Sequence, residues 1–260
     1  MVLDQAATSA LRTEVGGEHR YLLLLSHMRS YSSLLAHVLG SSPEVNGYGE
    51  TLLRYKLPLD LWRLRREIRR STGRPLRGPW LLDKVLHNTI KPLDRWVERD
   101  RLRALIFLRQ PEPTLRSVLT LAQADDPRSA MRDPQKCCDY YVSRLHRLRE
   151  DGERLGGGAL YLDAAALIQR PHAVLGAVGS WLGLHEPLAP SYEVGSRSGE
   201  VGFGDPSRNI RAGRILAAEA TTVRPDLRLP ADIVAEAEAA YRRCRTTLLQ
   251  HCASRPDLLV

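Results

Sequence analysis

Hydrophobic residues gather in five short runs along the chain, and each run is bounded by polar or turn-forming residues. Short apolar runs of this kind are typical of strands that are buried on both faces of a parallel sheet. Three clear runs occupy residues 21–25, 104–108 and 159–162, a fourth occupies 80–82, and residues 45–46 form a short fifth. We therefore expect a central parallel sheet of about four or five strands.

Between these runs, apolar residues recur every three to four positions, which is the spacing of helices. The spacing predicts helices over residues 33–39, 114–121, 134–149, 171–182 and 231–249, several of which begin at or just after a proline. Strands that alternate with helices predict an α/β fold in which helices flank the parallel sheet. We expect residues 1–260 to form a single domain, with a flexible stretch at 1–18, a glycine-rich loop at 190–210 and a C-terminal helix within 230–255.

Composition narrows the class of protein. Hydrophobic residues make up 43% of the 260 residues and charged residues 26%, which is ordinary for a globular protein. No run approaches the roughly 18–20 apolar residues of a membrane span, and residues 1–20 lack the plan of a secretion signal. The four cysteines have no framework spacing, so we interpret them as reduced thiols and expect a cytoplasmic protein without an integral membrane segment.

The chain carries 38 Lys and Arg against 30 Asp and Glu, for a formal net charge of +8, which favours anionic ligands in general. Nine of these cations lie in residues 54–77, where the acidic residues are Asp60 and Glu67. We interpret this segment as an amphipathic helix with a solvated basic face, or as the border of a cleft for an anionic or membrane-associated acceptor. It lacks interleaved aromatic residues, so we expect no nucleic-acid partner.

The first predicted strand runs into a polar loop, residues 26–33, and a helix follows at once. This arrangement can bind phosphate, because free N–H groups and the dipole of the helix point at the anion. Arg29 can supply a positive charge, and Ser30, Ser32 and Ser33 can supply hydroxyl donors. The loop lacks the glycine and lysine spacing of nucleoside triphosphatases. The alternative interpretation is that its serines only cap the helix.

A second polar segment follows the predicted strand at 104–108. Arg109 ends that strand, and Ser117 comes eight residues later, in the next predicted helix. A guanidinium at a strand end and a hydroxyl two helical turns onward can hold one phosphate from two sides. The alternative is a surface arginine and a solvated helix serine.

In their order and separation, the two segments resemble the sulfotransferase family, whose 5′-phosphosulfate loop commonly reads Pro-Arg-Ser-Gly-Thr-Thr. Arg29 and Ser30 match that pattern, Ser32 and Ser33 replace its threonine pair, and Met28 and Tyr31 stand where proline and glycine are usual. His27 also lies inside this loop, and we expect it to shape the loop. A tyrosine in place of glycine disfavours a left-handed backbone at Tyr31.

The resemblance covers roughly residues 20–210 and implies a P-loop-kinase-like three-layer sandwich. It also implies 3′-phosphoadenosine 5′-phosphosulfate (PAPS) as the donor and 3′-phosphoadenosine 5′-phosphate (PAP) as the product. Arg109 and Ser117 would contact the 3′-phosphate, although Gln110 stands where aspartate is usual. The loop at 190–210 corresponds to one that closes over the nucleotide, with Arg208 as a candidate contact.

Sulfuryl transfer needs a cation for the charge that builds on the leaving phosphate and a base for the acceptor proton. Arg29 suits the first task, and Lys84 lies where related enzymes often carry a lysine. Glu50, with Thr51 after it, resembles the catalytic glutamate of the protein-tyrosine and carbohydrate branches. His87 resembles the base histidine of the cytosolic branch. A lone histidine is more often structural, so we favour Glu50 and keep His87 as the alternative.

The expected function is transfer of a sulfuryl group from PAPS to a hydroxyl or amine of a small-molecule, carbohydrate or lipid acceptor. The oligomeric state is left open. The rival functions are an ATP-dependent small-molecule kinase with an atypical phosphate loop, and a non-catalytic module that binds anions or nucleic acid. No metal is implied, because the eight histidines show no ligand spacing with cysteines or carboxylates.

Overall fold

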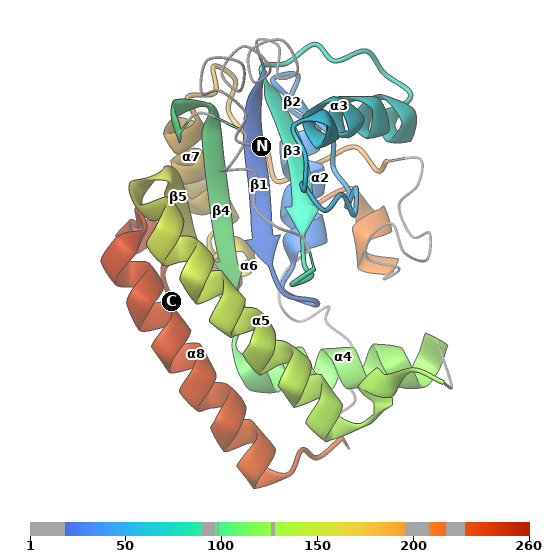
Figure 1. Cartoon of the computed structure of the whole chain (residues 1–260), viewed down its shortest axis with the longest axis vertical. Coiled ribbons are helices and arrows are strands. Elements are labelled where there is room, and N and C mark those ends of the chain that lie inside the picture. Colours follow the sequence, from blue (N-terminus) through green and yellow to red (C-terminus); the bar gives the residue numbers. More distant parts are fainter. Residues whose placement is uncertain (1–18, 90–96, 98, 126–127, 196–207, 217–226) are drawn as a thin grey trace, which may run out of the picture.

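A computed structural model describes residues 19–89, 97, 99–125, 128–195, 208–216 and 227–260. Its centre is a sheet of five parallel strands in the order β2-β3-β1-β4-β5 (Figure 1). The strands are β1 (Arg20–Ser26), β2 (Val45–Asn46), β3 (Trp80–Val85), β4 (Leu102–Leu108) and β5 (Ala159–Asp163). All five coincide with the predicted apolar runs, so the predicted parallel sheet is confirmed.

Helices cover both faces of this sheet, which is why its strands are apolar on both sides. In β1, Tyr21, Leu23 and Leu25 belong to one hydrophobic core, and Leu22 and Leu24 belong to the other. The first core includes residues of α3 (Leu59–Thr72), α4 (Pro111–Asp125), α5 (Pro134–Leu155) and α8 (Ala231–His251), and the second includes residues of α2 (Ser32–Gly40), α6 (Ala164–Gln169) and α7 (Pro171–Leu182). The result is the three-layer α/β sandwich that the sequence predicts.

The helices follow the predicted segments with small differences at their ends. Helix α4 begins at Pro111, ahead of the predicted start at 114, and α3 forms within the basic segment 54–77. Helix α6 was not predicted, because it is a short element between β5 and Pro171. The predicted flexible stretch at 1–18 and the middle of the loop at 190–210, residues 196–207, lie outside the described residues.

The C-terminal helix packs along α5 (Figure 1), and the chain after it returns to β5. Asp163, at the end of β5, accepts hydrogen bonds from the Arg245 guanidinium at 2.8 Å and from the Val260 N–H at 3.0 Å. The Tyr161 hydroxyl also donates to this carboxylate. These bonds anchor α8 and the last residue beside the sheet.

The four cysteines are buried and carry free thiols. Burial raises the pKa of the Cys137 thiol to about 12, so this side chain is an unreactive part of the core. Over the described ranges of the chain, none of the helices combines the length and hydrophobicity that crossing a membrane requires.

Candidate functional site

The carboxyl ends of three adjacent strands bring most of the predicted site residues together. Strand β1 lies between β3 and β4, with Leu24 paired to Lys84 and Ser26 paired to Phe107. The chain passes from β3 to β4 across β1, so the strand order reverses at this point. In open α/β sheets, the crevice at such a reversal is where ligands bind. The loops that follow β1 and β4 border this crevice.

The loop after β1 holds two residues other than glycine in the left-handed region, Arg29 with φ of 61° and Tyr31 with φ of 67°. The expectation that tyrosine would avoid this conformation is wrong. The Tyr31 ring lies against the Arg109 guanidinium, whose central carbon is 4.5 Å from the ring centroid. This cation–π contact offsets a backbone conformation that costs about 1–2 kcal/mol. Backbone strain that is held by its surroundings is typical of functional loops.

The N-terminus of α2 faces this loop. Tyr31 is its N-cap residue, no side chain caps the helix there, and its first turn contains no acidic residue. The loop serines have other partners: the Ser26 hydroxyl donates to the Phe107 carbonyl at 2.5 Å, and the Ser30 hydroxyl donates to the His27 carbonyl at 2.8 Å. The interpretation of these serines as helix caps is therefore wrong. The first N–H groups of α2 have no acceptor within the helix and suit an anion.

His27 is fully buried and joins the two polar loops. Its Nε2 accepts a hydrogen bond from the Arg109 N–H at 3.0 Å, so Nδ1 carries the proton and donates to the Met28 carbonyl at 2.9 Å. Burial lowers the pKa of the imidazole to about 3, so the ring is neutral. The buried His27 ring therefore ties the loop after β1 to the end of β4.

Arg29 connects the loop after β1 to the segment after β4. Its Nε donates to the Ser117 hydroxyl oxygen at 2.9 Å, and its carbonyl accepts from the Arg109 guanidinium at 2.8 Å. Arg109 and Ser117 are both buried. Burial lowers the pKa of Arg109, but a guanidinium stays charged in proteins. Two arginines and a serine from the two predicted phosphate-binding segments thus form one cationic cluster.

The three remaining catalytic candidates lie in a row. Lys84 is buried at the end of β3, and its Nζ is 2.7 Å from Ser33 Oγ and 3.1 Å from Glu50 Oε1. The other oxygen of Glu50, Oε2, is 3.6 Å from Nε2 of the half-buried His87. Lys84 therefore links the first turn of α2 to Glu50. Glu50 and His87, which the sequence offers as alternatives for one task, are neighbours.

A buried hydrogen-bond network that the sequence did not reveal fixes the backbone next to Glu50. The Asp83 carboxylate accepts hydrogen bonds from the Thr51 N–H and the Thr51 hydroxyl, each at 2.9 Å, and from the Tyr55 hydroxyl. Burial raises the pKa of Asp83 to about 6, and the nearby Glu50 carboxylate adds to this effect. Asp83 precedes Lys84, so one strand end positions both members of the Glu50–Lys84 pair.

Side chains of helix α5 form hydrogen bonds with the strand ends and loops that make up the site. The fully buried guanidinium of Arg144 donates to the Ser26 carbonyl at 2.7 Å and to the Val85 carbonyl at 2.8 Å, which joins the ends of β1 and β3. Tyr140 accepts from the Met28 N–H at 2.9 Å, and the Tyr141 hydroxyl donates to the Arg109 carbonyl at 2.7 Å. Sequence reasoning missed all three. The signal that could have revealed Arg144 is its position within the apolar stripe of the helix predicted at 134–149.

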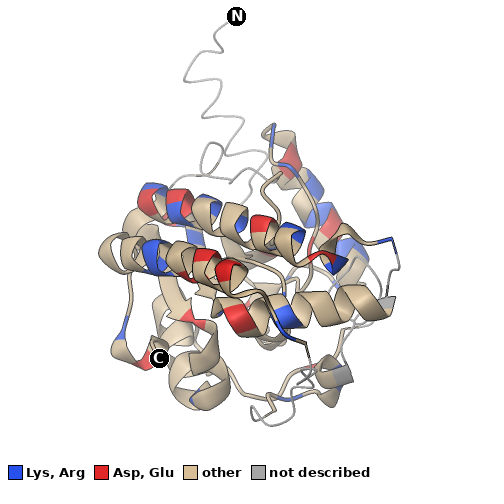
Figure 2. Cartoon of the chain, turned by 90° about the horizontal axis from the view of Figure 1, so that it is seen from below, with Lys and Arg blue, Asp and Glu red and all other residues tan. Residues whose placement is uncertain are grey.

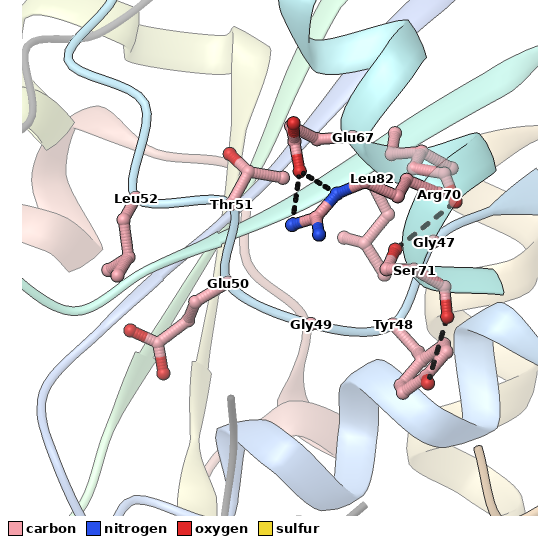
Figure 3. Close-up of a pocket in the computed structure, with 11 residues that line it drawn as sticks. Gly47, Tyr48, Gly49, Glu50, Thr51, Leu52, Glu67, Arg70, Ser71 and Leu82 are labelled. Atoms are coloured by element: carbon pink, nitrogen blue, oxygen red, sulfur yellow. Dashed lines mark hydrogen bonds and ion pairs between the residues drawn. The ribbon is translucent and has the colours of Figure 1, made fainter. Parts of the chain in front are cut away.

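A pocket of about 160 Å³ lies between the segment that carries Glu50 and helix α3 (Figure 3). Gly47, Tyr48, Gly49, Glu50, Thr51 and Leu52 line one side, and Glu67, Ile68, Arg70 and Ser71 line the other, with Leu82 of β3 between them. Figure 3 shows the Glu50 carboxylate directed away from the ion pair of Glu67 and Arg70. This pocket therefore adjoins the site without containing its cationic cluster.

Two further predictions concern Arg208 as a nucleotide contact and the question of a metal site. Arg208 begins a short 3₁₀ helix (Arg208–Ala212), but its side chain lies outside the described residues. In the part of the chain that the structure describes, no group of three or more His, Cys, Asp or Glu side chains is arranged to hold a metal ion.

Comparison with known proteins relates the chain to one fold. No protein-family model and no curated protein sequence matches it. Among solved structures, it is similar to the sulfotransferase domain from the curacin biosynthetic pathway, with a TM-score of 0.60 and 13% sequence identity. The match covers 87% of this chain and 97% of that domain. The chain therefore shares the fold of that domain.

Proposed function

We propose that this chain is a sulfotransferase that moves a sulfuryl group from PAPS to a hydroxyl or amine of a small-molecule, carbohydrate or lipid acceptor. One observation carries the proposal: Arg29 joins the two predicted phosphate-binding segments, with 2.9 Å from its Nε to Ser117 Oγ and 2.8 Å from its carbonyl to Arg109. The likeness in fold to a known sulfotransferase domain supports it.

The residues present fit a nucleotide that carries phosphate at both ends. The uncapped N-terminus of α2, with Arg29 and Lys84 beside it, suits the 5′ group, and Arg109 with Ser117 suits the 3′-phosphate. When bound, PAPS supplies an activated sulfuryl group. His27 beneath the loop is neutral, so it adds no positive charge that would repel the neighbouring arginines.

Each catalytic candidate then has a separate task. Arg29 and Lys84 offset the negative charge that builds on the leaving phosphate, because both are fixed near the N-terminus of α2. Glu50 takes the proton of the acceptor, and the Thr51–Asp83 hydrogen bonds hold it in place. His87 lies beside the second carboxylate oxygen and faces solvent, where it can pass that proton on.

The rival functions make different demands on the same site. A kinase would use ATP with Mg²⁺ at the loop after β1, and a nucleic-acid module would use the basic segment 54–77. Neither rival needs an arginine and a serine at the end of β4 to be joined to the loop after β1. The contacts that join the two predicted phosphate-binding segments are the feature that favours PAPS.

Thermal unfolding in the presence of three ligands separates these functions. We expect PAP to raise the Tm of the wild-type chain more than ATP with Mg²⁺ or duplex DNA at equal concentration, because ligands stabilise the state that binds them. The Arg109→Gln variant should lose most of the PAP effect, whereas Arg116→Gln should keep it, because the partly exposed Arg116 pairs with Glu112 and not with the cluster. An equal or larger stabilisation by ATP with Mg²⁺ would reject the sulfotransferase proposal in favour of the kinase.

A further inference from the structure

The basic segment 54–77 carries more positive charge than the fold balances, although Arg74 forms an ion pair with Glu193. Nine cations stand there against Asp60 and Glu67. Asp60 is buried and accepts hydrogen bonds from the Leu57 N–H and from Arg63, and Glu67 forms an ion pair with Arg70. By contrast, α5 and α8 each carry charges of both signs (Figure 2), with ion pairs such as Arg147–Asp151 and Arg242–Glu238. Helix α3 therefore presents a net cationic surface.

The same region exposes large apolar side chains. Over the described residues, seven large hydrophobic side chains are exposed, and four of them lie between residues 52 and 62. Their exposed fractions are 52% for Leu52, 56% for Leu57, 47% for Leu59 and 48% for Trp62. The Arg66 guanidinium lies 5.2 Å from the Trp62 ring centroid, so basic and apolar groups are mixed. A merely solvated basic face does not need such residues.

The fold holds these side chains outward. The buried Tyr55 and the partly buried Thr51 both donate hydrogen bonds to Asp83, and Leu52 and Tyr55 adopt left-handed φ values of 57° and 48°. Three buried residues of α3, Leu61, Leu64 and Ile68, fix the helix on the sheet. The exposed leucines and Trp62 therefore belong to ordered elements, and their exposure is a property of the native structure.

We propose that residues 52–70, the 52–70 surface, bind the surface of an anionic lipid bilayer. Trp62 and the three leucines would enter the level of the lipid headgroups, and the surrounding arginines would face lipid phosphates, as in peripheral proteins that lie on membranes. Duplex nucleic acid would use the cations but would leave the four apolar side chains in water. The combination of charge and apolar groups thus favours a bilayer.

This surface is continuous with the candidate site. The pocket beside Glu50 is lined by Leu52 on one side and by Arg70 on the other, and both residues belong to the 52–70 surface. A headgroup presented from a bilayer would therefore reach the Glu50 segment, which points to an amphiphilic acceptor. This consequence rests on the proposed function, whereas binding to a bilayer does not.

The test is flotation of the full chain with vesicles of phosphatidylcholine alone or with about one third phosphatidylserine, at low and high salt. We expect binding to the anionic vesicles only, and release by salt. Trp62→Ser should weaken binding about tenfold and Arg66→Gln about fivefold. The matched controls are Leu249→Ser and Arg242→Gln on α8, both exposed, which should bind as the wild type does.

Three results would overturn the proposal: no preference for anionic vesicles, equal loss in the α8 controls, or binding to duplex DNA at the same salt that Trp62→Ser leaves unchanged. Circular dichroism of each variant checks that it is folded. Vesicle binding is measured without nucleotide, so a chain that floats with vesicles but gains no stability from PAP would reject the sulfotransferase and keep the docking surface. A chain that gains stability from PAP but does not float with vesicles would keep the sulfotransferase proposal and reject the docking surface.

Discussion

Glu50 and Lys84 form an ion pair at the carboxyl edge of the sheet, with Oε1 and Nζ 3.1 Å apart. The lysine is fully buried and also binds Ser33 in the first turn of α2, so the charge that would assist the leaving phosphate touches the group that would take the acceptor proton. The site therefore couples its two chemical tasks through one side chain. Changes to either residue should have separable effects on binding and turnover.

Glu50→Gln should lower kcat by about 10²- to 10⁴-fold and leave the affinity for PAP nearly unchanged, because the amide keeps the shape of the carboxylate but is no base. Turnover with PAPS and calorimetric titration with PAP measure the two effects. Glu238→Gln on α8 is the control and should behave as the wild type does. Full turnover in Glu50→Gln together with its loss in His87→Ala would make His87 the base instead.

Ser117→Ala should weaken PAP binding about fivefold, and Arg29→Gln should weaken it about tenfold or more. The serine change removes one hydroxyl and releases the Arg29 side chain, whereas the arginine change removes the charge itself. Titration calorimetry with PAP provides the measurement. If Arg116→Gln, one residue away, weakens binding as much as Ser117→Ala, the effect is not specific to the joined cluster.

Tyr55→Phe should lower the free energy of unfolding by about 1.5–3 kcal/mol, because it removes a hydrogen bond to the buried Asp83 carboxylate. It should also reduce kcat more than it changes the affinity for PAP, since it loosens the segment that carries Glu50. Urea denaturation and steady-state kinetics test both effects. A loss of stability with unchanged kcat would limit Tyr55 to a structural role.

The pH dependence of the free energy of unfolding should reveal the raised pKa of Asp83. Its pKa is about 6 in the folded chain and about 3.9 in an unfolded one, so the folded state binds the proton more tightly. Ionisation of Asp83 therefore opposes folding, and its contribution to the free energy of unfolding falls as the pH rises from about 4 to about 6. Asp83→Asn does not titrate, so the difference in stability between variant and wild type should move in favour of the variant across that interval. Urea denaturation at several pH values measures it, and a constant difference would contradict the assignment.

Arg144→Met should lower the free energy of unfolding by about 3 kcal/mol or more, because it leaves the buried carbonyls of Ser26 and Val85 without donors. The exposed Arg242→Met should change stability by less than about 0.5 kcal/mol. Urea denaturation of both variants provides the comparison. Equal losses of stability in the two variants would show that Arg144 does not support the strand ends.

The fold could be predicted because its strands are buried on both faces, which leaves continuous apolar runs in the sequence. The loops after β1 and β4 were found for a related reason, since they follow such runs. Asp83 and Arg144 escaped prediction because their roles depend on partners far along the chain, Tyr55 for the first and Ser26 for the second. The backbone at Tyr31 was predicted wrongly because its compensating contact, Arg109, belongs to another loop.

The position of β1 between β3 and β4 also bears on how the protein is made. The first loop emerges early in synthesis, but Lys84, Arg109 and Ser117 come from strands and helices that follow much later in the chain. Parallel pairing over such sequence distances is slow, and β1 cannot be paired on both sides until β4 has also left the ribosome. A nascent chain thus acquires the cluster of Arg29, Arg109 and Ser117 only after residue 117 has been synthesised, so a ligand of that cluster can stabilise the finished sheet but cannot guide its first steps.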